Sequence, residues 1–255
     1  MLDKTAGQIV SSAFAELNGV GVIYPNKTVA LKPTDISFSD NEVTVLLGPS
    51  GAGKSTLLRV LNRLVVPTSG TVRIRDLGVL ESRKVVRAHR LRTGMVFQQH
   101  QLISRLTALQ NVLLSRIGNY SFIRSLLPLP TSERYWALEC LERVGLFEKA
   151  LERCDALSGG QQQRVGIARA IAQRPDLILA DEPVASLDPA SSERVLSSLR
   201  GICKQDGIPA IISLHQLEYA REFADRIIGL SHGAVVFDGR SDEHTDDVLE
   251  KIYGV

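Results

Sequence analysis

A glycine-rich run that could bind phosphate lies at residues 48–56. It matches the pattern G-x-x-x-x-G-K-[ST] in full, and it stands between an apolar segment and a segment with helical apolar spacing. Small residues let backbone N–H groups converge on an anion, and the N-terminus of the following helix adds positive dipole character. Lys54 would reach the β and γ phosphates of a nucleoside triphosphate, and the Ser55 hydroxyl would bind Mg²⁺. The residues predicted to form this phosphate loop are Gly48, Pro49, Ser50, Gly51, Ala52, Gly53, Lys54, Ser55 and Thr56.

Polar residues also follow other apolar runs of strand length. Continuous apolar runs are typical of parallel strands that are covered on both faces. In an open parallel sheet, ligands bind beyond the carboxyl ends of the strands, so these polar residues would meet the phosphates there. The runs are 43–47 before the phosphate loop, 95–97 before Gln98, 177–180 before Asp181 and Glu182, and 210–214 before His215.

Each of these polar residues suits phosphate chemistry by its type. Asp181 can hold the Mg²⁺ shell because a hard cation prefers carboxylate oxygen, and Gln98 can reach both the metal and a water molecule. Glu182 can polarise the attacking water, while His215 can contact the γ-phosphate or orient that base. Any one of them alone could be a satisfied buried polar group, and for His215 the two interpretations are equally good. Their joint placement favours a site that hydrolyses a nucleotide.

A second possible anion site opens the helix predicted to follow residue 157. Ser158 is a good N-cap, and Gly159 and Gly160 leave the first N–H groups of the helix without side-chain cover. Gln161 and a run with helical apolar spacing follow, and the helix should stop before Pro175. Such a site could act on the same phosphates only if the fold, or a second copy of the chain, brings it to Lys54. The alternative is a helix start that needs only the conformational freedom of glycine.

Residues 9–47 are predicted to form short strands joined by tight turns. The β-branched stretches 20–23, 28–31 and 36–38 are separated by Pro25, Pro33 and Asp40. Tyr24 precedes the first of these turns, on a segment expected near the phosphate loop. It could stack on an adenine ring, although an exposed or half-buried strand tyrosine is the commoner case.

The 255 residues, 44% of them apolar, fit one large α/β domain or a domain with an inserted lobe. A formal charge of +2 gives no overall basic field that would favour nucleic acid, and we expect no nucleic-acid partner. The basic cluster at 83–92 is predicted to be the solvated face of a surface helix. Three widely spaced cysteines fit a reducing compartment. No run of 18 apolar residues and no export signal is visible, so we expect no membrane span.

Between Gln98 and Asp181 the chain changes character. Helical spacing at 106–114, 120–129 and 135–144 predicts a mostly helical lobe inserted into the sheet domain. We therefore expect a single domain over residues 1–255, with a core and β portion at about 1–98 and 175–255 and a helical subdomain at about 99–174. The apolar and basic piece 122–127 could face a partner or could equally belong to the core of this lobe.

Taken in order, these motifs resemble those of the nucleotide-binding subunits of ABC transporters. The most specific one is Leu-Ser-Gly-Gly-Gln at 157–161, because the phosphate loop alone would also fit kinases and GTPases. The resemblance implies the ABC ATPase fold: a mainly parallel core sheet, an N-terminal antiparallel β subdomain and an inserted helical subdomain. It also implies ATP and Mg²⁺, with Tyr24 as the adenine-stacking aromatic. Asp40-Asn41-Glu42 departs from the Gly-Glu turn usual in the family, which questions a turn conformation and not the chemistry.

The resemblance also implies partners. Two copies would pack head to tail, so that Ser158, Gly159, Gly160 and Gln161 of one close over the ATP held by Lys54 of the other. Asp188 would lie in the loop between the two sites. ATP binding would close this pair and so move a membrane permease, hydrolysis would reopen the pair, and Leu102 and Leu106 are the candidate permease contacts. A separate substrate-binding protein would deliver the cargo, and the chain would lie peripherally on the cytoplasmic face of the inner membrane.

Within the family, the chain is similar to the phosphonate importer subgroup. The stretches that carry this likeness are 97–103, 111–113, 143–146, 179–189 and 213–216. The implied activity is hydrolysis of ATP to ADP and phosphate, coupled to phosphonate uptake. Phosphite, hypophosphite and phosphate are the alternative cargoes. An exporter subunit is less expected because no fused membrane domain is present. A non-transport ABC ATPase or a phosphotransferase is less expected because the first needs long coiled coils or two phosphate loops, and the second has no use for the 157–161 motif.

Overall fold

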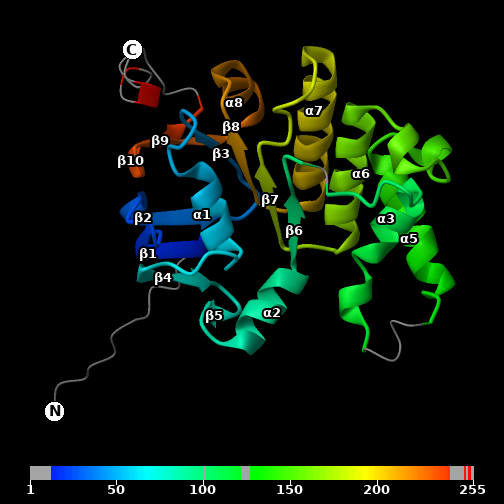
Figure 1. The fold of residues 1–255 in the computed structure, drawn as a ribbon, viewed down its shortest axis with the longest axis horizontal. Coiled ribbons are helices and arrows are strands. Elements are labelled where there is room, and N and C mark those ends of the chain that lie inside the picture. Colours follow the sequence, from blue (N-terminus) through cyan, green and yellow to red (C-terminus); the bar gives the residue numbers. More distant parts are fainter. Residues whose placement is uncertain (1–12, 100, 122–126, 242–249, 251, 254–255) are drawn as a thin grey trace.

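The computed structural model describes residues 13–99, 101–121, 127–241, 250 and 252–253. Figure 1 labels its elements along the chain. The strands are β1 (Ala13–Ile23), β2 (Val29–Ser39), β3 (Val43–Leu47), β4 (Ser69–Ile74), β5 (Gly78–Val79), β6 (Thr93–Val96), β7 (Leu177–Asp181), β8 (Ala210–Leu214), β9 (Arg226–Ser231) and β10 (Ala234–Arg240). The α-helices are α1 (Lys54–Leu61), α2 (Arg83–Leu91), α3 (Ala108–Leu114), α5 (Thr131–Arg143), α6 (Gly159–Ala172), α7 (Pro189–Asp206) and α8 (Leu217–Phe223). Short 3₁₀ turns are η1 (Ile117–Asn119), η2 (Phe147–Lys149) and η3 (Cys154–Ala156).

The central sheet has the strand order β10-β9-β3-β8-β7-β6. Five of these strands, from β9 to β6, are parallel to one another. The edge strand β10 is antiparallel to β9. Every residue of β3, β7 and β8 is buried, as continuous apolar runs predict for strands covered on both faces. The predicted parallel sheet is therefore confirmed. One end of β6 differs, because the strand stops at Val96 and Phe97 lies beyond it.

The two faces of the central sheet belong to different hydrophobic clusters. Val43, Val45 and Leu47 of β3 pack with residues of α6, α7 and α8. Leu46 points the other way and packs with α1 and with the strands of the N-terminal sheet. This alternation follows from the two-residue repeat of side-chain direction along a strand. It fixes α1 on one side of the sheet and α6, α7 and α8 on the other.

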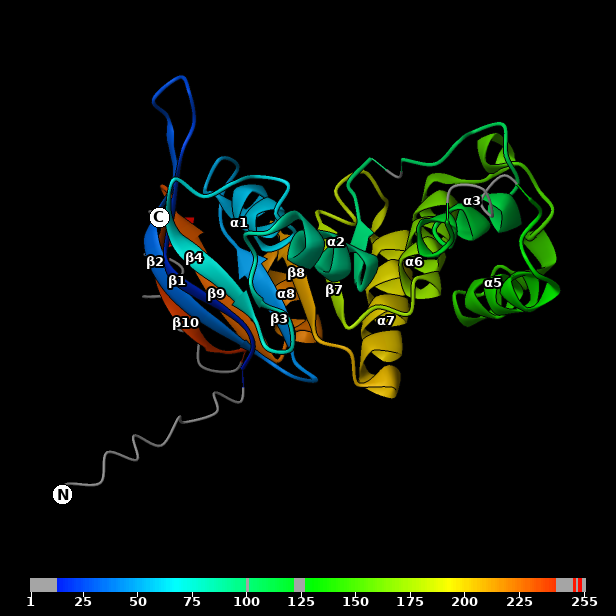
Figure 2. The same ribbon diagram turned by 90° about the horizontal axis from the view of Figure 1, so that it is seen from below.

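The N-terminal sheet is antiparallel, with the strand order β2-β1-β4-β5. The prediction of several short strands here is wrong: β1 and β2 are continuous strands of 11 residues each. Pro33, predicted to interrupt a strand, lies inside β2. The sheet tolerates it because β2 is an edge strand, and register shifts near Val20 and Val22 mark β-bulges at the same level. Figure 2 shows this sheet and the helical portion at opposite ends of the molecule, with the core sheet between them.

The helical portion contains α3, α5 and α6, which pack on one another. Helices predicted at 106–114 and 135–144 correspond to α3 and α5. The third predicted helix, 120–129, lies partly outside the described residues. The same is true of most of the apolar and basic piece 122–127. At the start of the predicted helix, Tyr120 has an extended conformation and follows η1 as its C-cap. Thr107 begins α3 with a capping box that it shares with Gln110. The subdomain boundaries at about 98 and 175 stay a prediction.

The predicted surface helix is α2, which carries Arg83, Lys84, Arg87 and Arg90 as exposed residues. His89 is an exception to the predicted solvated face, because it is 2% exposed. Its Nε2 lies 2.9 Å from the Leu61 carbonyl oxygen at the end of α1. Burial, opposed by that hydrogen bond, lowers the pKa of His89 to about 4.

The turn at 40–42 has Asn41 where the family pattern has glycine. Asn41 has φ 57°, in the left-handed region that asparagine tolerates better than most residues. Across the described ranges, no helix has both the length and the apolar character that crossing a lipid bilayer needs.

Candidate active site

The phosphate loop joins the end of β3 to the start of α1. Gly53 is the N-cap of α1, with φ 108° and no side-chain hydrogen bond to the first turn. The first N–H groups of this helix therefore remain available to an anion. Glycine is needed at two positions of the loop for lack of space. A Cβ on Gly48 would lie 2.2 Å from the Leu230 carbonyl oxygen, and one on Gly53 would lie 2.6 Å from that of Ala30.

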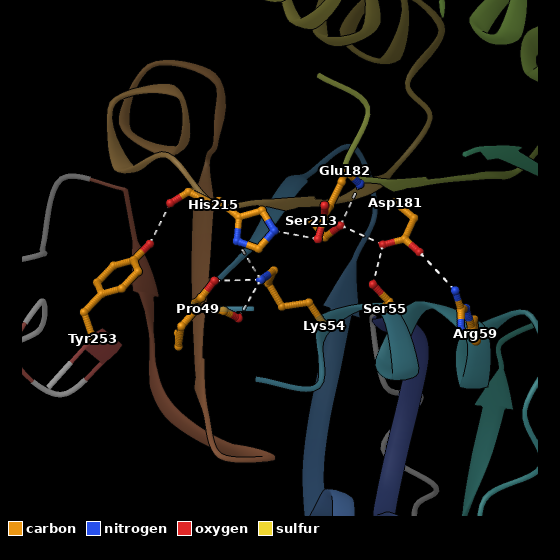
Figure 3. Close-up of polar contacts among 10 residues, drawn as sticks. Pro49, Lys54, Ser55, Arg59, Asp181, Glu182, Ser213, His215 and Tyr253 are labelled. Atoms are coloured by element: carbon orange, nitrogen blue, oxygen red, sulfur yellow. Dashed lines mark hydrogen bonds and ion pairs between the residues drawn. The ribbon is translucent and has the colours of Figure 1, made fainter. Parts of the chain in front are cut away.

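Lys54 lies under the loop and is 3% exposed. Its ammonium donates to the carbonyl oxygens of Gly48 at 2.6 Å and Pro49 at 3.0 Å. Nζ is also 3.3 Å from Nδ1 of His215 (Figure 3). Burial lowers the pKa of Lys54, and the carboxylates of Glu182 and Asp181 oppose that shift. The side chain thus holds a partly desolvated positive charge where the loop would hold phosphate.

Asp181, the last residue of β7, joins α1 to the central sheet. Its Oδ1 accepts hydrogen bonds from the hydroxyl of Ser55 at 2.7 Å and the hydroxyl of Ser213 at 3.0 Å. Its Oδ2 lies 4.0 Å from a guanidinium nitrogen of Arg59, one turn beyond Ser55 on α1. A serine hydroxyl and a carboxylate at this separation are the hard oxygen donors that Mg²⁺ prefers, so the donor set fits that ion.

Glu182 follows Asp181 and points toward His215 (Figure 3). Its Oε1 is 2.6 Å from Nε2 of His215. Because the ammonium of Lys54 can only donate, Nδ1 of His215 must accept, which leaves the proton on Nε2 facing the carboxylate. Glu182 has φ 48°, in the left-handed region that L-residues rarely adopt, and its N–H donates to the Ser213 hydroxyl at 2.8 Å. Tyr253 donates to the His215 carbonyl oxygen at 2.8 Å.

A cavity of about 250 Å³ opens above the phosphate loop. Tyr24 forms one side of it, and its hydroxyl is 3.3 Å from the Thr56 hydroxyl on α1. Glu182, which follows the end of β7, also lines the cavity. A site lined by an aromatic ring, by uncapped helix N–H groups and by a carboxylate fits a nucleotide with its phosphates toward the loop. The lining consists of Tyr24, Thr28, Val29, Ala30, Gly51, Ala52, Gly53, Lys54, Ser55, Thr56 and Glu182.

Gln98 occupies different surroundings. It borders a second cavity of about 360 Å³, together with Gln162, Ser186 and Leu102. Gln98 is not among the residues that line the cavity above the phosphate loop. The structure therefore brings together Lys54, Ser55, Asp181, Glu182 and His215, and it places Gln98 on a different cavity.

The 157–161 motif opens α6 as predicted. The Ser158 hydroxyl accepts from the N–H of Gln161 at 3.3 Å, and the Gln161 side chain accepts from the N–H of Ser158 at 2.9 Å. This capping box uses one of the N–H groups expected to be uncovered. A Cβ on Gly160 would lie 3.1 Å from the Ser191 side chain on α7. Asp188 caps α7 by accepting from the N–H of Ser191 at 3.0 Å, so the loop that bears it lies against the start of α6.

Three contributors to this site were not predicted from the sequence. Ser213 is the only polar residue of β8, two positions before His215, and that interruption of an apolar run was a usable signal. Arg59 lies one helical turn after Ser55, which could also have been noticed. Tyr253 comes from the far end of the chain, and no local pattern links it to His215.

The comparisons with known proteins agree with this geometry. The family model "ABC transporter" matches residues 31–185. The chain is 59% identical to "Phosphite import ATP-binding protein PxtA" of Stutzerimonas stutzeri, over 96% of this chain and 88% of that protein. It is 60% identical to "Phosphonates import ATP-binding protein PhnC 1" of Trichodesmium erythraeum, over 93% of this chain and 94% of that protein.

Solved structures give the same assignment of fold. The dimeric post-hydrolysis structure of the ATP-binding cassette MJ0796 bound to ADP and Pi superposes with a TM-score of 0.77 at 36% identity, covering 89% of this chain and 98% of that one. The structure of cbiO1 from Clostridium perfringens, described as part of the ABC transporter complex cbiONQ, superposes with a TM-score of 0.81 at 28% identity, covering 91% of this chain and 90% of that one. The fold expected from the sequence is confirmed, and the chain belongs to the ABC transporter family of ATP-binding proteins.

Proposed function

We propose that this chain is the ATP-hydrolysing subunit of a bacterial importer that takes up phosphonate, with phosphite, hypophosphite or phosphate as the alternative cargo. The observation that carries the proposal is the continuous set of polar contacts from Lys54 through His215 to Glu182, beside the Ser55–Asp181 pair. The names of the relatives, which include phosphonate and phosphite importers, support the class of cargo.

ATP would bind with its adenine on Tyr24 and its phosphates on the loop at 48–56. Lys54 would leave the carbonyl oxygens of Gly48 and Pro49 and turn its charge to the β and γ phosphates. Ser55 and Asp181 would hold Mg²⁺, and Gln98 would reach it from the end of the neighbouring strand β6. Bound Mg²⁺ would neutralise charge on the phosphate oxygens of ATP.

Glu182 would act as the general base. As a water oxygen bonds to the γ-phosphorus, the carboxylate accepts the proton of that water, and the bond between the γ-phosphorus and the bridging oxygen breaks to release ADP. The short contact with Nε2–H of His215 would keep the carboxylate oriented for this step. His215 lies beside Lys54 and would therefore be close enough to contact the γ-phosphate that Lys54 binds.

A second copy of the chain would complete each site. Ser158, Gly159, Gly160 and Gln161 lie outside the lining of the phosphate-loop cavity of their own chain. In a head-to-tail pair they would face the nucleotide of the other copy, with Asp188 between the two sites. The dimeric state described for the MJ0796 cassette supports this arrangement.

The chain would lie on the cytoplasmic face of the inner membrane, bound to a membrane permease. Closure of the pair by ATP would move that permease. A ligand changes a conformational equilibrium only through its preference for one state, and ATP would prefer the closed pair. The cavity that contains Leu102 is our candidate for the permease contact, with Leu106 close by in the chain. A separate substrate-binding protein would select the cargo, and we propose no nucleic-acid partner.

Growth of a deletion strain tests the proposal. The strain is grown with phosphonate, phosphite, hypophosphite or phosphate as the sole phosphorus source and is complemented with wild type or with Glu182→Gln. We expect growth to fail on one source and to return only with wild type, because the amide cannot accept the proton of water. Unimpaired growth on every source would contradict the proposed cargo. Full rescue by Glu182→Gln would contradict the role of Glu182.

A further inference from the structure

Ser213 is a polar side chain in the middle of the packed core. It lies on β8 between strands β3 and β7, its exposed fraction is 0%, and its neighbours along the strand are apolar. A hydroxyl in such a place must find hydrogen-bond partners, because an unsatisfied buried polar group is costly. Ser213 finds both of its partners on β7 and its extension, at Asp181 and Glu182.

The direction of the two hydrogen bonds is fixed by chemistry. The N–H of Glu182 can only donate, so the Ser213 oxygen accepts it at 2.8 Å. The Asp181 carboxylate can only accept, so the Ser213 proton goes to its Oδ1 at 3.0 Å. The hydroxyl therefore links the Glu182 N–H to the Asp181 carboxylate through two consecutive hydrogen bonds, and each bond polarises the other.

We propose that Ser213 is a positioning residue for hydrolysis, acting through Glu182. Pairing of β7 with β8 ends at Asp181 and Ser213, and beyond that point no ladder bond holds Glu182 in place. The bond to Ser213 anchors the Glu182 backbone at its left-handed φ of 48°, which directs the side chain toward His215. The same hydroxyl fills one acceptor position of Asp181 Oδ1, beside Ser55. This inference rests on the proposed function, because it assigns Ser213 a part in the reaction at that site.

The key variant is Ser213→Ala in the full-length chain. It removes both bonds and frees the Glu182 backbone while leaving Lys54, Ser55 and Tyr24 unchanged. We expect kcat for ATP hydrolysis to fall about tenfold or more, since small misplacements of a reacting group cost that much. The KM and the Kd for ATP should stay within about twofold of wild type. Ser213→Thr, which keeps the hydroxyl, should recover most of kcat.

Thr44→Val is the matched control. Thr44 is a buried hydroxyl on β3 of the same sheet, and it also donates to a carboxylate, that of Glu42 at 2.8 Å, but at the opposite end of the strand from the site. It should lose stability with no change in kcat. Urea unfolding of every variant separates loss of fold from loss of positioning.

A second background tests whether Ser213 acts through Glu182. In the Glu182→Gln chain, the added Ser213→Ala change should alter the residual kcat less than twofold, because position 182 no longer carries a carboxylate to be positioned and Asp181 keeps its contact with Ser55. A tenfold fall in that background would overturn the inference, as would a Ser213→Ala chain with wild-type kcat or a loss shared equally by Thr44→Val. If wild type itself fails to hydrolyse ATP, the proposed function fails, and this outcome is distinct from the others.

Discussion

Histidine serves two different purposes in this chain. His215 lies at a strand end between a lysine and a carboxylate, and its proton is assigned by those two partners. His89 is enclosed between α1, α2 and β6, where its Nε2–H donates to the Leu61 carbonyl oxygen and lies 3.4 Å from the Thr93 hydroxyl. The first environment suits a group that responds to a ligand. The second favours a permanently neutral side chain that fastens the end of α1.

The buried His89 should make stability depend on pH. Its folded pKa of about 4 lies below the ordinary histidine pKa of 6.5, so between these values the unfolded chain binds a proton that the folded chain does not. Stability is therefore full above pH 6.5 and falls as the pH drops toward 4. We expect the wild type to lose about 2 kcal/mol more than His89→Gln between pH 7 and pH 5. The glutamine keeps an N–H donor and cannot titrate.

Urea unfolding at the two pH values measures this difference. His232→Gln is the control, because His232 is exposed and the same substitution there should leave the pH dependence of wild type unchanged. An equal pH dependence in wild type and in His89→Gln would contradict the assignment.

The residues that could be predicted from the sequence are those that end an apolar run with a charge or an imidazole. Asp181, Glu182 and His215 were found in this way, and the structure does bring them together. Ser213 was not predicted although it interrupts the apolar run of β8 two positions before His215, because a serine inside a strand does not by itself show which group it binds. The solvated face predicted for α2 was wrong at His89 because a single residue of a basic run can point inward when the helix packs on a neighbour.

At the scale of elements, one side chain connects the ends of three helices. Arg116 follows α3, and its guanidinium donates to Glu133 in the first turn of α5 at 2.7 and 3.1 Å. It also donates to the Gln173 carbonyl oxygen at the end of α6 at 3.3 Å. Tyr120 adds a hydrogen bond to Glu133 at 2.9 Å. The hydrogen bonds from Arg116, opposed by burial and aided by Tyr120, lower the pKa of Glu133.

Loss of this guanidinium should destabilise the helical portion. The side chains of Arg116 and Glu133 are only 9% and 12% exposed, so Arg116→Met leaves a largely buried carboxylate without its cation. We expect the free energy of unfolding to fall by about 3 kcal/mol, as measured by urea denaturation. Arg153→Met breaks an exposed pair with Asp155, which solvent screens, and should lower the free energy of unfolding far less than Arg116→Met does. Equal losses in the two variants would show that burial of the Arg116 pair does not matter.

Prediction of elements from the sequence succeeded where one signal dominated. The bounds of β3 and β8 follow directly from mainly apolar runs of strand length, in which Thr44 and Ser213 are the polar residues. The predicted division of the N-terminal sheet into short strands is wrong because a proline usually ends a strand. Pro33 lies inside β2, which is an edge strand, and no local pattern reveals that a strand lies at the edge of a sheet. The 120–129 helix rested on apolar spacing alone, without capping residues, and its middle lies outside the described residues.

At the scale of the whole molecule, the two predicted anion-binding features lie apart. The phosphate loop opens α1 on one side of the central sheet, and the 157–161 motif opens α6 on the other side of β6 and β7 (Figure 1). Ser158 and Gly159 are exposed, and Gly160 is partly so. Under the proposed function, one chain would therefore present both a nucleotide site and a surface that covers the nucleotide of another chain.

This separation predicts a dimer that depends on ATP. Glu182→Gln should bind ATP without hydrolysing it, so its closed pair should persist and elute as a dimer in size-exclusion chromatography with light scattering. Wild type with ATP, and Glu182→Gln without ATP, should elute mainly as monomers. Adding Ser158→Arg to Glu182→Gln should abolish the dimer, because a bulky cation replaces the small cap at the contact. Its ATP-induced rise in Tm should remain, since the phosphate loop is intact. Ser132→Arg, on the exposed first turn of α5, is the control and should leave the dimer unchanged. A Ser158→Arg chain that still dimerises with ATP would rule out the 157–161 motif as the surface that covers the second nucleotide.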